Sequence, residues 1–281
     1  MLYFIWGLNW VVMKAANQFF PPVLFVTYRF VLGAAVLLAV CAWLRIPLPP
    51  RKYWSWIALT GVLQVAANNV AAQLGMQTLG AGLVAVLNYS MPVWVAILAH
   101  FFLQEHLTPR KVLGIGMSMG GLFVLLQIDT YGSLYGILLT LSGAFAWAVA
   151  AILIKLKLQG CDMLQYTTWQ LTAGAALLVL YSVFAEQGPV TWNAAAVECL
   201  LYNGILASAF AFFLWSYILG HMEAGKAAVA ILAVPVVGVI CGVFFLQEEL
   251  SWNTALGMLL ILAGILLVVM QCRRIVFQQH S

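Results

Sequence analysis

The chain has 281 residues, of which 65% are hydrophobic and 7% are charged, and its net charge is +4. Soluble domains carry about 25% charged residues, so this composition excludes a protein whose whole surface is solvated by water. The mean hydropathy of +1.03 is typical of a chain surrounded by lipid.

Apolar runs long enough to cross a bilayer follow one another along the whole chain. Each membrane-spanning helix needs about 20 mainly apolar residues. Such runs predict ten helices, over residues 2–20, 23–44, 54–77, 82–102, 110–128, 133–155, 163–184, 196–219, 225–246 and 253–271. The linkers between them are short. The sequence therefore predicts an all-α membrane protein of ten transmembrane helices with no soluble domain.

Basic residues in the connections predict the orientation of the bundle. The connections after every second span hold Arg45, Arg51, Lys52, Arg110, Lys111, Lys155, Lys157, Lys226, Arg273 and Arg274. The connections on the opposite side lack Lys and Arg and carry Asp129, Glu186, Glu198, Glu248 and Glu249. Because loops rich in Lys and Arg stay in the cytoplasm, we expect a bacterial inner (plasma) membrane protein with both termini cytoplasmic.

The two halves of the chain resemble each other. The segment from Trp6 (WGLNWVVMK) matches the segment from Trp147 (WAVAAILIK), 141 residues later. The motif FFLQEHL, which begins at Phe101, matches FFLQEEL, which begins at Phe244. These matches predict two five-helix units, residues 1–129 and 130–281. An odd number of spans inserts the second unit upside down, so we expect inverted repeats with a substrate site between them.

At these residues the chain resembles the drug/metabolite transporter superfamily, EamA-type branch. The resemblance rests on the WGxNW opening and on the motif Phe-Leu-x-Glu-x-Leu-Thr/Ser, present at 102–108 and 245–251. It implies ten spans, with the third, fourth, eighth and ninth joining the first and sixth around a central cavity. It also implies export of amino acids, related metabolites or drugs. Gln104 and Gln247 depart from the family, which often has a small residue there.

Polar residues inside the first and third spans are candidates for lining the cavity. Trp6, Asn9, Trp10 and Met13 share one broad face of the first helix. The alternative for this face is helix packing with an interfacial tryptophan belt. The third span carries amides at Gln64, Asn68, Asn69, Gln73 and Gln77, three of them recurring every four residues. Five amides exceed what hydrogen bonding between helices needs, so we favour a cavity wall.

The fourth and eighth spans offer the other candidates. Asn88, Tyr89 and Pro92 lie in the fourth span, and the ninth span has Pro235. Prolines kink helices, so Pro92 and Pro235 are candidate gating hinges, although packing against a neighbour also explains a single proline. The eighth span offers Trp215 and Tyr217 instead of amides. A cavity with an amide wall opposite an aromatic wall suits an amphipathic substrate with an apolar side chain.

Arg29, in the second span, is the most deeply placed charge. It can bind a substrate carboxylate through two hydrogen bonds, or it can fix a neighbouring helix through that helix's carbonyls. The candidate substrate-binding residues are Trp6, Asn9, Trp10, Arg29, Asn68, Asn69, Gln73, Asn88, Tyr89, Trp147, Trp215 and Tyr217.

The absence of deep acidic residues narrows the function. All eight Asp and Glu residues fall in loops or at span ends, which disfavours an antiporter of cationic drugs. The spans show no nucleophile–base pair, and the cysteines lack metal-binding spacing. We therefore expect an exporter of neutral or aromatic amino acids or related metabolites, and not an enzyme. Multidrug efflux and, more remotely, a membrane enzyme are the alternatives.

The expected partners follow from this function. They are a small-molecule substrate and membrane lipid, with no cofactor, metal or nucleic acid. Glycines in the fifth and tenth spans allow close helix approach, namely Gly114, Gly116, Gly120, Gly121, Gly257 and Gly264. We assign them to packing within the chain, which favours a monomer, with a homodimer interface as the alternative.

Overall fold

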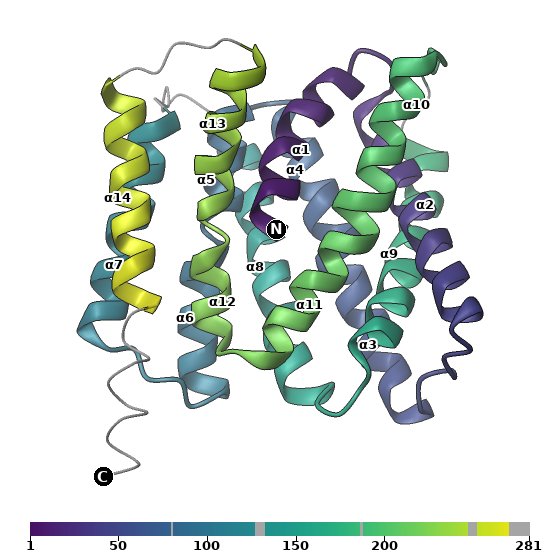
Figure 1. The fold of residues 1–281 in the computed structure, drawn as a ribbon, viewed down its shortest axis with the longest axis horizontal. Coiled ribbons are helices and arrows are strands. Elements are labelled where there is room, and N and C mark those ends of the chain that lie inside the picture. Colours follow the sequence, from purple (N-terminus) through teal and green to yellow (C-terminus); the bar gives the residue numbers. More distant parts are fainter. Residues whose placement is uncertain (80, 127–132, 186–187, 247–251, 270–281) are drawn as a thin grey trace.

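The computed structural model describes the whole chain except residues 80, 127–132, 186–187, 247–251 and 270–281. All regular structure within the described ranges is helical (Figure 1). The helices are α1 (Leu2–Ala16), α2 (Pro22–Trp43), η1 (Arg51–Tyr53), α3 (Trp54–Thr60), η2 (Gly61–Ala67), α4 (Asn68–Met76), α5 (Ala81–Asn88), α6 (Met91–Phe102), α7 (Pro109–Leu126), α8 (Leu134–Lys157), α9 (Met163–Ala185), α10 (Ala194–Leu201), η3 (Tyr202–Phe210), α11 (Ala211–His221), α12 (Ala224–Ala230), α13 (Ala233–Leu246) and α14 (Trp252–Val269).

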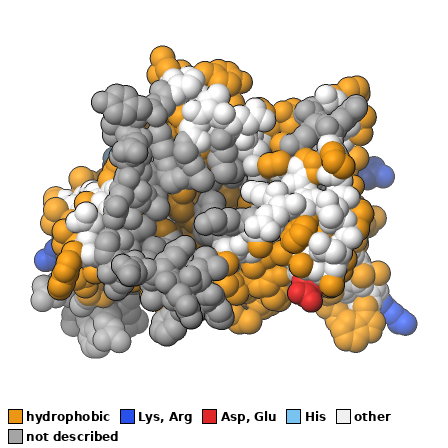
Figure 2. Space-filling model, turned by 90° about the horizontal axis from the view of Figure 1, so that it is seen from above, with side chains coloured by type: hydrophobic (Ala, Val, Ile, Leu, Met, Phe, Trp, Pro, Cys, Tyr) orange, Lys and Arg blue, Asp and Glu red, His pale blue; other side chains and the backbone are white. Residues whose placement is uncertain are grey.

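Several of these helices are long and apolar enough to cross a membrane. Five such stretches are Pro22–Trp43, Arg51–Gly75, Leu134–Lys157, Met163–Phe184 and Ala194–His221. Shorter apolar helices include Met91–Phe102 and Ala224–Gly238. Large apolar side chains cover the outer surface, where Phe184 and Trp252 are 87% and 92% exposed. Hydrophobic side chains also gather over the upper face, whose surface is hollowed near its middle (Figure 2). The expected all-α membrane class is confirmed.

Two long helical stretches change from α to π geometry in the middle. The π-helical segment η2 joins α3 to α4, and the π-helical segment η3 joins α10 to α11. Each extra residue in a π turn rotates the following helix relative to the preceding one, and such turns are frequent at functional sites. The amino-acid pattern did not predict either segment, because neither contains proline.

Two other stretches are interrupted by a two-residue turn, which we call a helix break. Tyr89 and Ser90 separate α5 from α6, and Ile231 and Leu232 separate α12 from α13. Pro92 lies in the first turn of α6, where a missing N–H leaves no helical bond unmade. Pro235 is the third residue of α13. The expected kinks are therefore breaks, while a hinge role for the two prolines stays a prediction.

Helices α7 and α14 pack side by side along their length, at one end of the molecule (Figure 1). A Cβ atom on Gly114 would lie 2.6 Å from the carbonyl oxygen of Gly264, and one on Gly121 would lie 2.7 Å from that of Gly257. These backbones can approach so closely only because the side chains are missing. Gly114, Gly121 and Gly264 thus serve packing within the chain, whereas a Cβ atom on Gly116 or Gly120 would meet nothing within 4 Å, so these two are not needed for it.

A cluster of four charged residues joins the loop after α6 to the start of α12, at the lower end of the bundle in Figure 1. We call Glu105, Lys111, Glu223 and Lys226 the basal ion cluster. The Glu105 carboxylate accepts hydrogen bonds from the backbone N–H groups of Ala224 (2.7 Å) and Gly225 (3.1 Å). Lys111 Nζ lies 3.0 Å from Glu223 Oε2 and 4.0 Å from Glu105 Oε2, and Lys226 Nζ lies 2.6 Å from Glu223 Oε1.

The charges of this cluster compensate one another. Lys111 and Lys226 are buried, with 7% and 8% of their surface exposed. Partial burial alone would raise the pKa of Glu223, but the hydrogen bonds and charges of Lys226 and Lys111 outweigh it, and the pKa is lowered. The cluster therefore links the first half of the chain to the second through fully partnered carboxylates.

Candidate functional site

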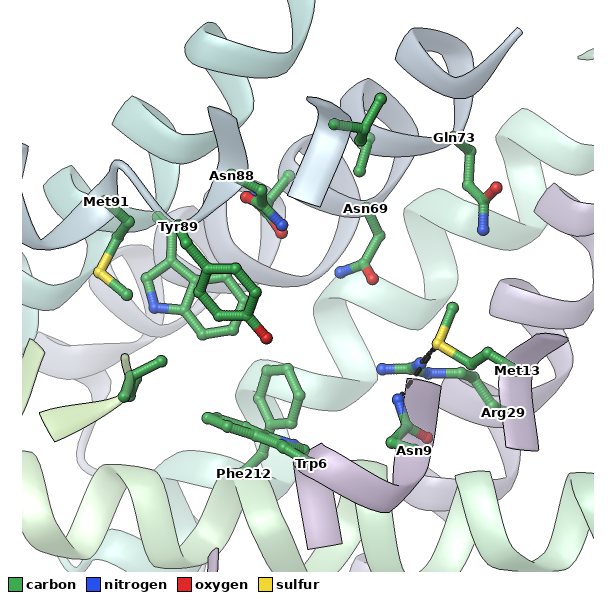
Figure 3. A pocket seen from close by; sticks show the side chains of 15 residues that line it. Trp6, Asn9, Met13, Arg29, Asn69, Gln73, Asn88, Tyr89, Met91 and Phe212 are labelled. Carbon is green, nitrogen blue, oxygen red and sulfur yellow. Dashed lines mark hydrogen bonds between the residues drawn. The ribbon is translucent and has the colours of Figure 1, made fainter. Parts of the chain in front are cut away.

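A cavity of about 120 Å³ lies where the helix breaks meet α1, α2, α4, α8 and α11. A buried water needs roughly 10–15 Å³ of such space, so there is room for several waters or a small metabolite. Nine of the expected residues line it (Figure 3), namely Trp6, Asn9, Arg29, Asn68, Asn69, Gln73, Asn88, Tyr89 and Trp147. They come from α1, α2, α4, α5, α8 and the break after α5, and the fold brings these segments together.

One wall of the cavity carries amides from α4 and α5. Asn68 Nδ2 donates to Asn88 Oδ1 at 2.8 Å, which ties the two helices together. Asn69 Nδ2 donates to the carbonyl of Val65 in the π-helical segment at 2.7 Å. The amides of Asn69 and Gln73 both extend toward the cavity (Figure 3). This wall therefore offers hydrogen-bonding groups in fixed positions.

The opposite wall is aromatic. Trp6 contacts Trp147 edge-on with ring centroids 6.0 Å apart, and it contacts Phe212 in the same way at 5.8 Å. The indole N–H of Trp6 donates to the carbonyl of Ala207 at 3.0 Å. Edge-to-face pairs of this kind stabilise a fixed arrangement. The three rings form a rigid apolar surface against which a substrate side chain can pack.

Gln64 fixes the aromatic wall from behind. With its amide oxygen turned toward the indoles, the buried Gln64 accepts hydrogen bonds from Nε1 of Trp147 at 3.0 Å and of Trp215 at 2.8 Å. The orientation of the amide is assigned from these partners. Gln64 also lies 2.7 Å from the amide of Gln170 on α9. This third-span amide is therefore part of a buried network and does not line the cavity.

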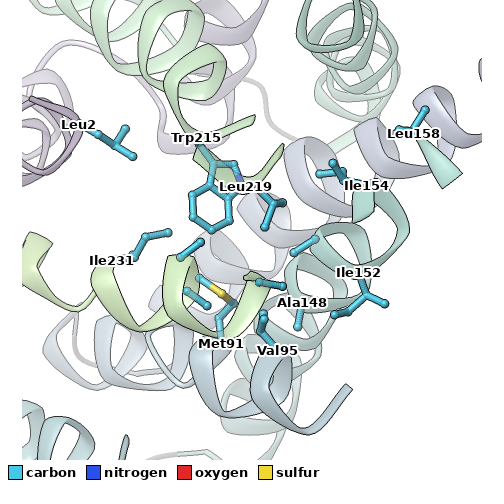
Figure 4. Packing of buried hydrophobic residues seen from close by; sticks show 14 of the residues in the cluster. Leu2, Met91, Val95, Ala148, Ile152, Ile154, Leu158, Trp215, Leu219 and Ile231 are labelled. Carbon is cyan, nitrogen blue, oxygen red and sulfur yellow. The ribbon is translucent and has the colours of Figure 1, made fainter. Parts of the chain in front are cut away.

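The floor of the cavity is the largest cluster of buried apolar residues. Met91 and Ile231, at the two helix breaks, line the cavity and also belong to this cluster. Figure 4 shows them packed near Trp215, with Val95 and Ala148 alongside. Both breaks thus lie between the cavity above and a packed core below.

Arg29 enters the cavity from α2. It is 5% exposed, and its Nη1 lies 3.4 Å from both Met13 Sδ and Asn203 Oδ1. Asn203 is completely buried in η3 and donates to the carbonyl of Cys199 at 3.1 Å. The second span thus reaches the cavity through the guanidinium of Arg29.

Two expected residues do not line the cavity. Trp215 is 1% exposed and is held in the core by Gln64, and Tyr217 is 49% exposed on the outer surface, 4.1 Å from the ring of His221. Their place is taken by Phe212, one turn earlier in α11. Trp215 is turned away from the cavity because its indole N–H reaches the amide oxygen of Gln64, and Tyr217 lies on the outward face of the same helix. The side chain of Trp10 lies outside the described residues.

Six lining residues were not among the candidate binding residues, namely Met13, Ala72, Val84, Met91, Phe212 and Ile231, although the helical spacing had placed Met13 on the same face as Trp6 and Asn9. All are apolar, and apolar residues in a span look the same whether they face a cavity, a neighbour or lipid. Asn203, which contacts Arg29, was also missed. A lone Asn in an Ala- and Leu-rich span was the available signal.

The whole chain is similar to known transporters. The EamA-like transporter family matches residues 1–127 and 134–270. The uncharacterized transporter YoaV of Bacillus subtilis is 33% identical over 269 residues, covering 93% of this chain and 91% of that protein. A probable amino-acid metabolite efflux pump of Salmonella typhimurium is 28% identical, covering 93% of this chain and 90% of that protein.

A solved structure has the same fold. Its TM-score is 0.85 at 20% identity, and the match covers 97% of this chain and 96% of that one. Family and relatives together confirm the expectation of a membrane transporter and not an enzyme. The chain belongs to the EamA-like transporter family.

Proposed function

We propose that this protein exports amino acids, with neutral or aromatic side chains favoured, or related small metabolites through the cavity described above. The observation that carries this proposal is the combination of an amide wall, an aromatic wall and two helix breaks in one cavity of a transporter-family chain. Discontinuous helices near the middle of the bundle are typical of substrate sites in secondary transporters.

The proposed architecture is ten spans arranged as two inverted repeats, residues 1–129 and 130–281. The order of helical features supports it. The stretch containing η2 precedes the break after α5, and the stretch containing η3 precedes the break after α12. Pro92 and Pro235, one in each half, follow these breaks. The first region that matches the family ends at residue 127 and the second begins at residue 134, close to the proposed boundary between residues 129 and 130. In this arrangement the cavity lies between the repeats and gives access to each side in turn.

The proposed location is the inner membrane, with the lower end of Figure 1 in the cytoplasm. Helices α2 and α8 end there, and η1 and α7 begin there. Arg45, Arg51, Arg110 and Lys157 belong to these ends. The asymmetric distribution of Lys and Arg supports this orientation. Both termini are proposed to be cytoplasmic, and a monomer is the favoured state.

The substrate preference follows from the two walls. A small solute can place a polar head against Asn69 and Gln73 and an apolar side chain against Trp6 and Phe212. Cationic drugs fit the cavity less well, because its described lining contains Arg29 and no carboxylate. This observation favours metabolite export over the alternative of multidrug efflux.

Transport by the purified protein in liposomes tests the proposal. Proteoliposomes should accumulate labelled phenylalanine or leucine in a saturable way by counterflow. Asn69→Ala and Gln73→Ala should each lower the rate about tenfold, because each removes a group from the amide wall. Gln18→Ala is the matched control, since Gln18 is exposed at the end of α1 and lies outside the cavity. Absence of counterflow for every amino acid and its deaminated analogue would contradict the proposal.

A further inference from the structure

The guanidinium of Arg29 is a buried cation whose charge no described residue neutralises. Its two hydrogen-bond partners, Met13 Sδ and Asn203 Oδ1, are neutral, and both contacts are 3.4 Å long. Hydrogen bonds of an arginine to a carboxylate are typically 2.7–2.9 Å. Its Nε is buried with no partner, and none of the ion pairs among the described residues includes it. The Cζ atom of Arg29 also lies 4.6 Å from the centre of the Phe30 ring, a cation–π contact that stabilises the cation but brings no negative charge. The Nε donor stays unused.

An isolated charge in this position is unfavourable unless something compensates it. Moving an ionised group into a low-dielectric interior requires several kcal/mol even after relaxation, and only a partner ion or strong hydrogen bonds restore the balance. Charged residues within spans mark substrate pathways for this reason. The natural compensation for Arg29 is an anion that enters the cavity.

The groups beside Arg29 indicate what kind of anion fits. Figure 3 shows the guanidinium between Asn9 and Asn69, directed into the cavity. Asn9 Oδ1 is buried with no partner, so it can accept one hydrogen bond from a ligand. The rings of Trp6 and Phe212 lie on the opposite side. A planar anion at Arg29 with an apolar body across the cavity matches this arrangement.

Charge distinguishes two such ligands. A monocarboxylate without an amine brings the charge of the described lining from +1 to zero. An amino acid of the same skeleton brings an ammonium group as well, which leaves the net charge at +1 and places two cations close together. No carboxylate among the described lining residues is available to that ammonium. A neutral 2-hydroxyl group can donate to Asn9 Oδ1 without adding charge.

We propose that Arg29 is the carboxylate-binding residue of the cavity, and that the transporter prefers apolar monocarboxylates with a neutral C2 atom to the corresponding amino acids. This inference rests on the proposed function and names the head group that the cavity selects. The carboxylate accepts two hydrogen bonds from the guanidinium, and Asn203 positions Arg29 through its own side-chain oxygen. The apolar part of the substrate packs on the aromatic wall.

Three compounds that differ only at C2 test the proposal, namely 3-phenylpropionate, 3-phenyllactate and phenylalanine. Their counterflow is measured in proteoliposomes of phosphatidylcholine, which contain no anionic lipid. Both amine-free acids should half-saturate transport at about tenfold lower concentration than phenylalanine. Phenethylamine, which lacks the carboxylate, should neither be transported nor inhibit.

Variants separate recognition of the carboxylate from folding. Arg29→Met should abolish transport and thermal stabilisation by both acids, while Arg29→Lys should keep the charge and lose part of the affinity. Arg110→Met is the matched control, because Arg110 is exposed at the start of α7. Thermal unfolding without ligand verifies that each variant is folded.

The outcomes are distinct. Transport of phenylalanine with equal or better affinity than the acids, or wild-type transport by a folded Arg29→Met variant, overturns the inference and leaves the proposed function standing. Failure of the folded wild-type protein to transport or bind any of the three compounds overturns the inference, and failure with every other amino acid and its deaminated analogue as well contradicts the proposed function too. Stabilisation by chloride or inorganic phosphate equal to that by 3-phenylpropionate also overturns the inference, because it would mean that Arg29 selects charge and not a carboxylate with an apolar body.

Discussion

The basal ion cluster and the cavity both contain buried cations, but only the cations of the cluster lie beside carboxylates. In the basal ion cluster, Lys111 and Lys226 each lie within 3.0 Å of Glu223, and the Glu105 carboxylate takes up two backbone N–H groups. In the cavity, Arg29 has two long contacts with neutral atoms and lies over the ring of Phe30, with no carboxylate among the described residues beside it. A buried charge with its partners in place holds two segments together, and one without them is available to a ligand.

The largest expected effect on stability comes from a substitution in the basal ion cluster. Glu105→Ala should lower the free energy of unfolding by about 3 kcal/mol, because it leaves Lys111 less compensated and two N–H groups at the start of α12 without an acceptor. Thermal and denaturant unfolding in detergent micelles measures this. The exposed Glu198 provides the control Glu198→Ala, which should change stability by less than about 0.5 kcal/mol. Equal stability of the two variants would mean that the cluster does not hold the lower end together.

A second test addresses the uncharged hydrogen-bond network of Gln64, Trp147 and Trp215 beside the cavity. Gln64→Leu should destabilise the protein by about 2 kcal/mol, because the indole N–H groups of Trp147 and Trp215 lose their shared acceptor. The emission spectrum of the protein should shift as the two tryptophans lose this hydrogen bond. Unchanged stability and an unchanged spectrum together would show that the network is not formed.

Removing the unpartnered cation Arg29 should raise the stability of the protein instead of lowering it. Arg29→Met should raise the free energy of unfolding in the absence of ligand by about 1 kcal/mol, because it removes a buried charge that has no counterion among the described residues. The same unfolding experiment measures it, with Arg110→Met as the exposed control. A loss of stability as large as that of Glu105→Ala would show that Arg29 has a structural partner equivalent to a carboxylate.

The smallest expected effect is the pH dependence of the basal ion cluster. The pKa of Glu223 is lowered from its ordinary value of 4.5 by Lys226 and Lys111 despite partial burial, so the folded protein holds fewer protons there than the unfolded chain. Its contribution to stability is therefore present above about pH 4.5 and is lost as the pH falls through the lowered value. The difference in Tm between wild type and Glu223→Gln should shrink as the pH is lowered from about 7 to about 3. A difference that stays constant would contradict a role for ionised Glu223.

Composition and periodicity predicted the helical membrane class and the amides that line the cavity. The prolines Pro92 and Pro235 predicted kinks in two spans, but the breaks lie two to four residues before them, at 89–90 and 231–232. The choice of Trp215 and Tyr217 over Phe212 as cavity lining was wrong, because which face of α11 meets the cavity depends on partners from other helices, such as Gln64 for Trp215. The unpartnered state of Arg29 was equally hidden, because it depends on Met13 and Asn203, which come from other helices.

The broken helices have one further consequence. At each break a few short-range bonds replace the regular helical ladder, as with Ser90 N to Leu87 O and Leu232 N to Val229 O. Such points bend easily, while the segments on either side remain stiff. Helices α6 and α12 pack against each other below the breaks, and α13 packs against α1 above them. If the breaks act as the proposed hinges, the segments above and below them tilt separately. One end of the bundle then widens while the helix packing at the other end is unchanged.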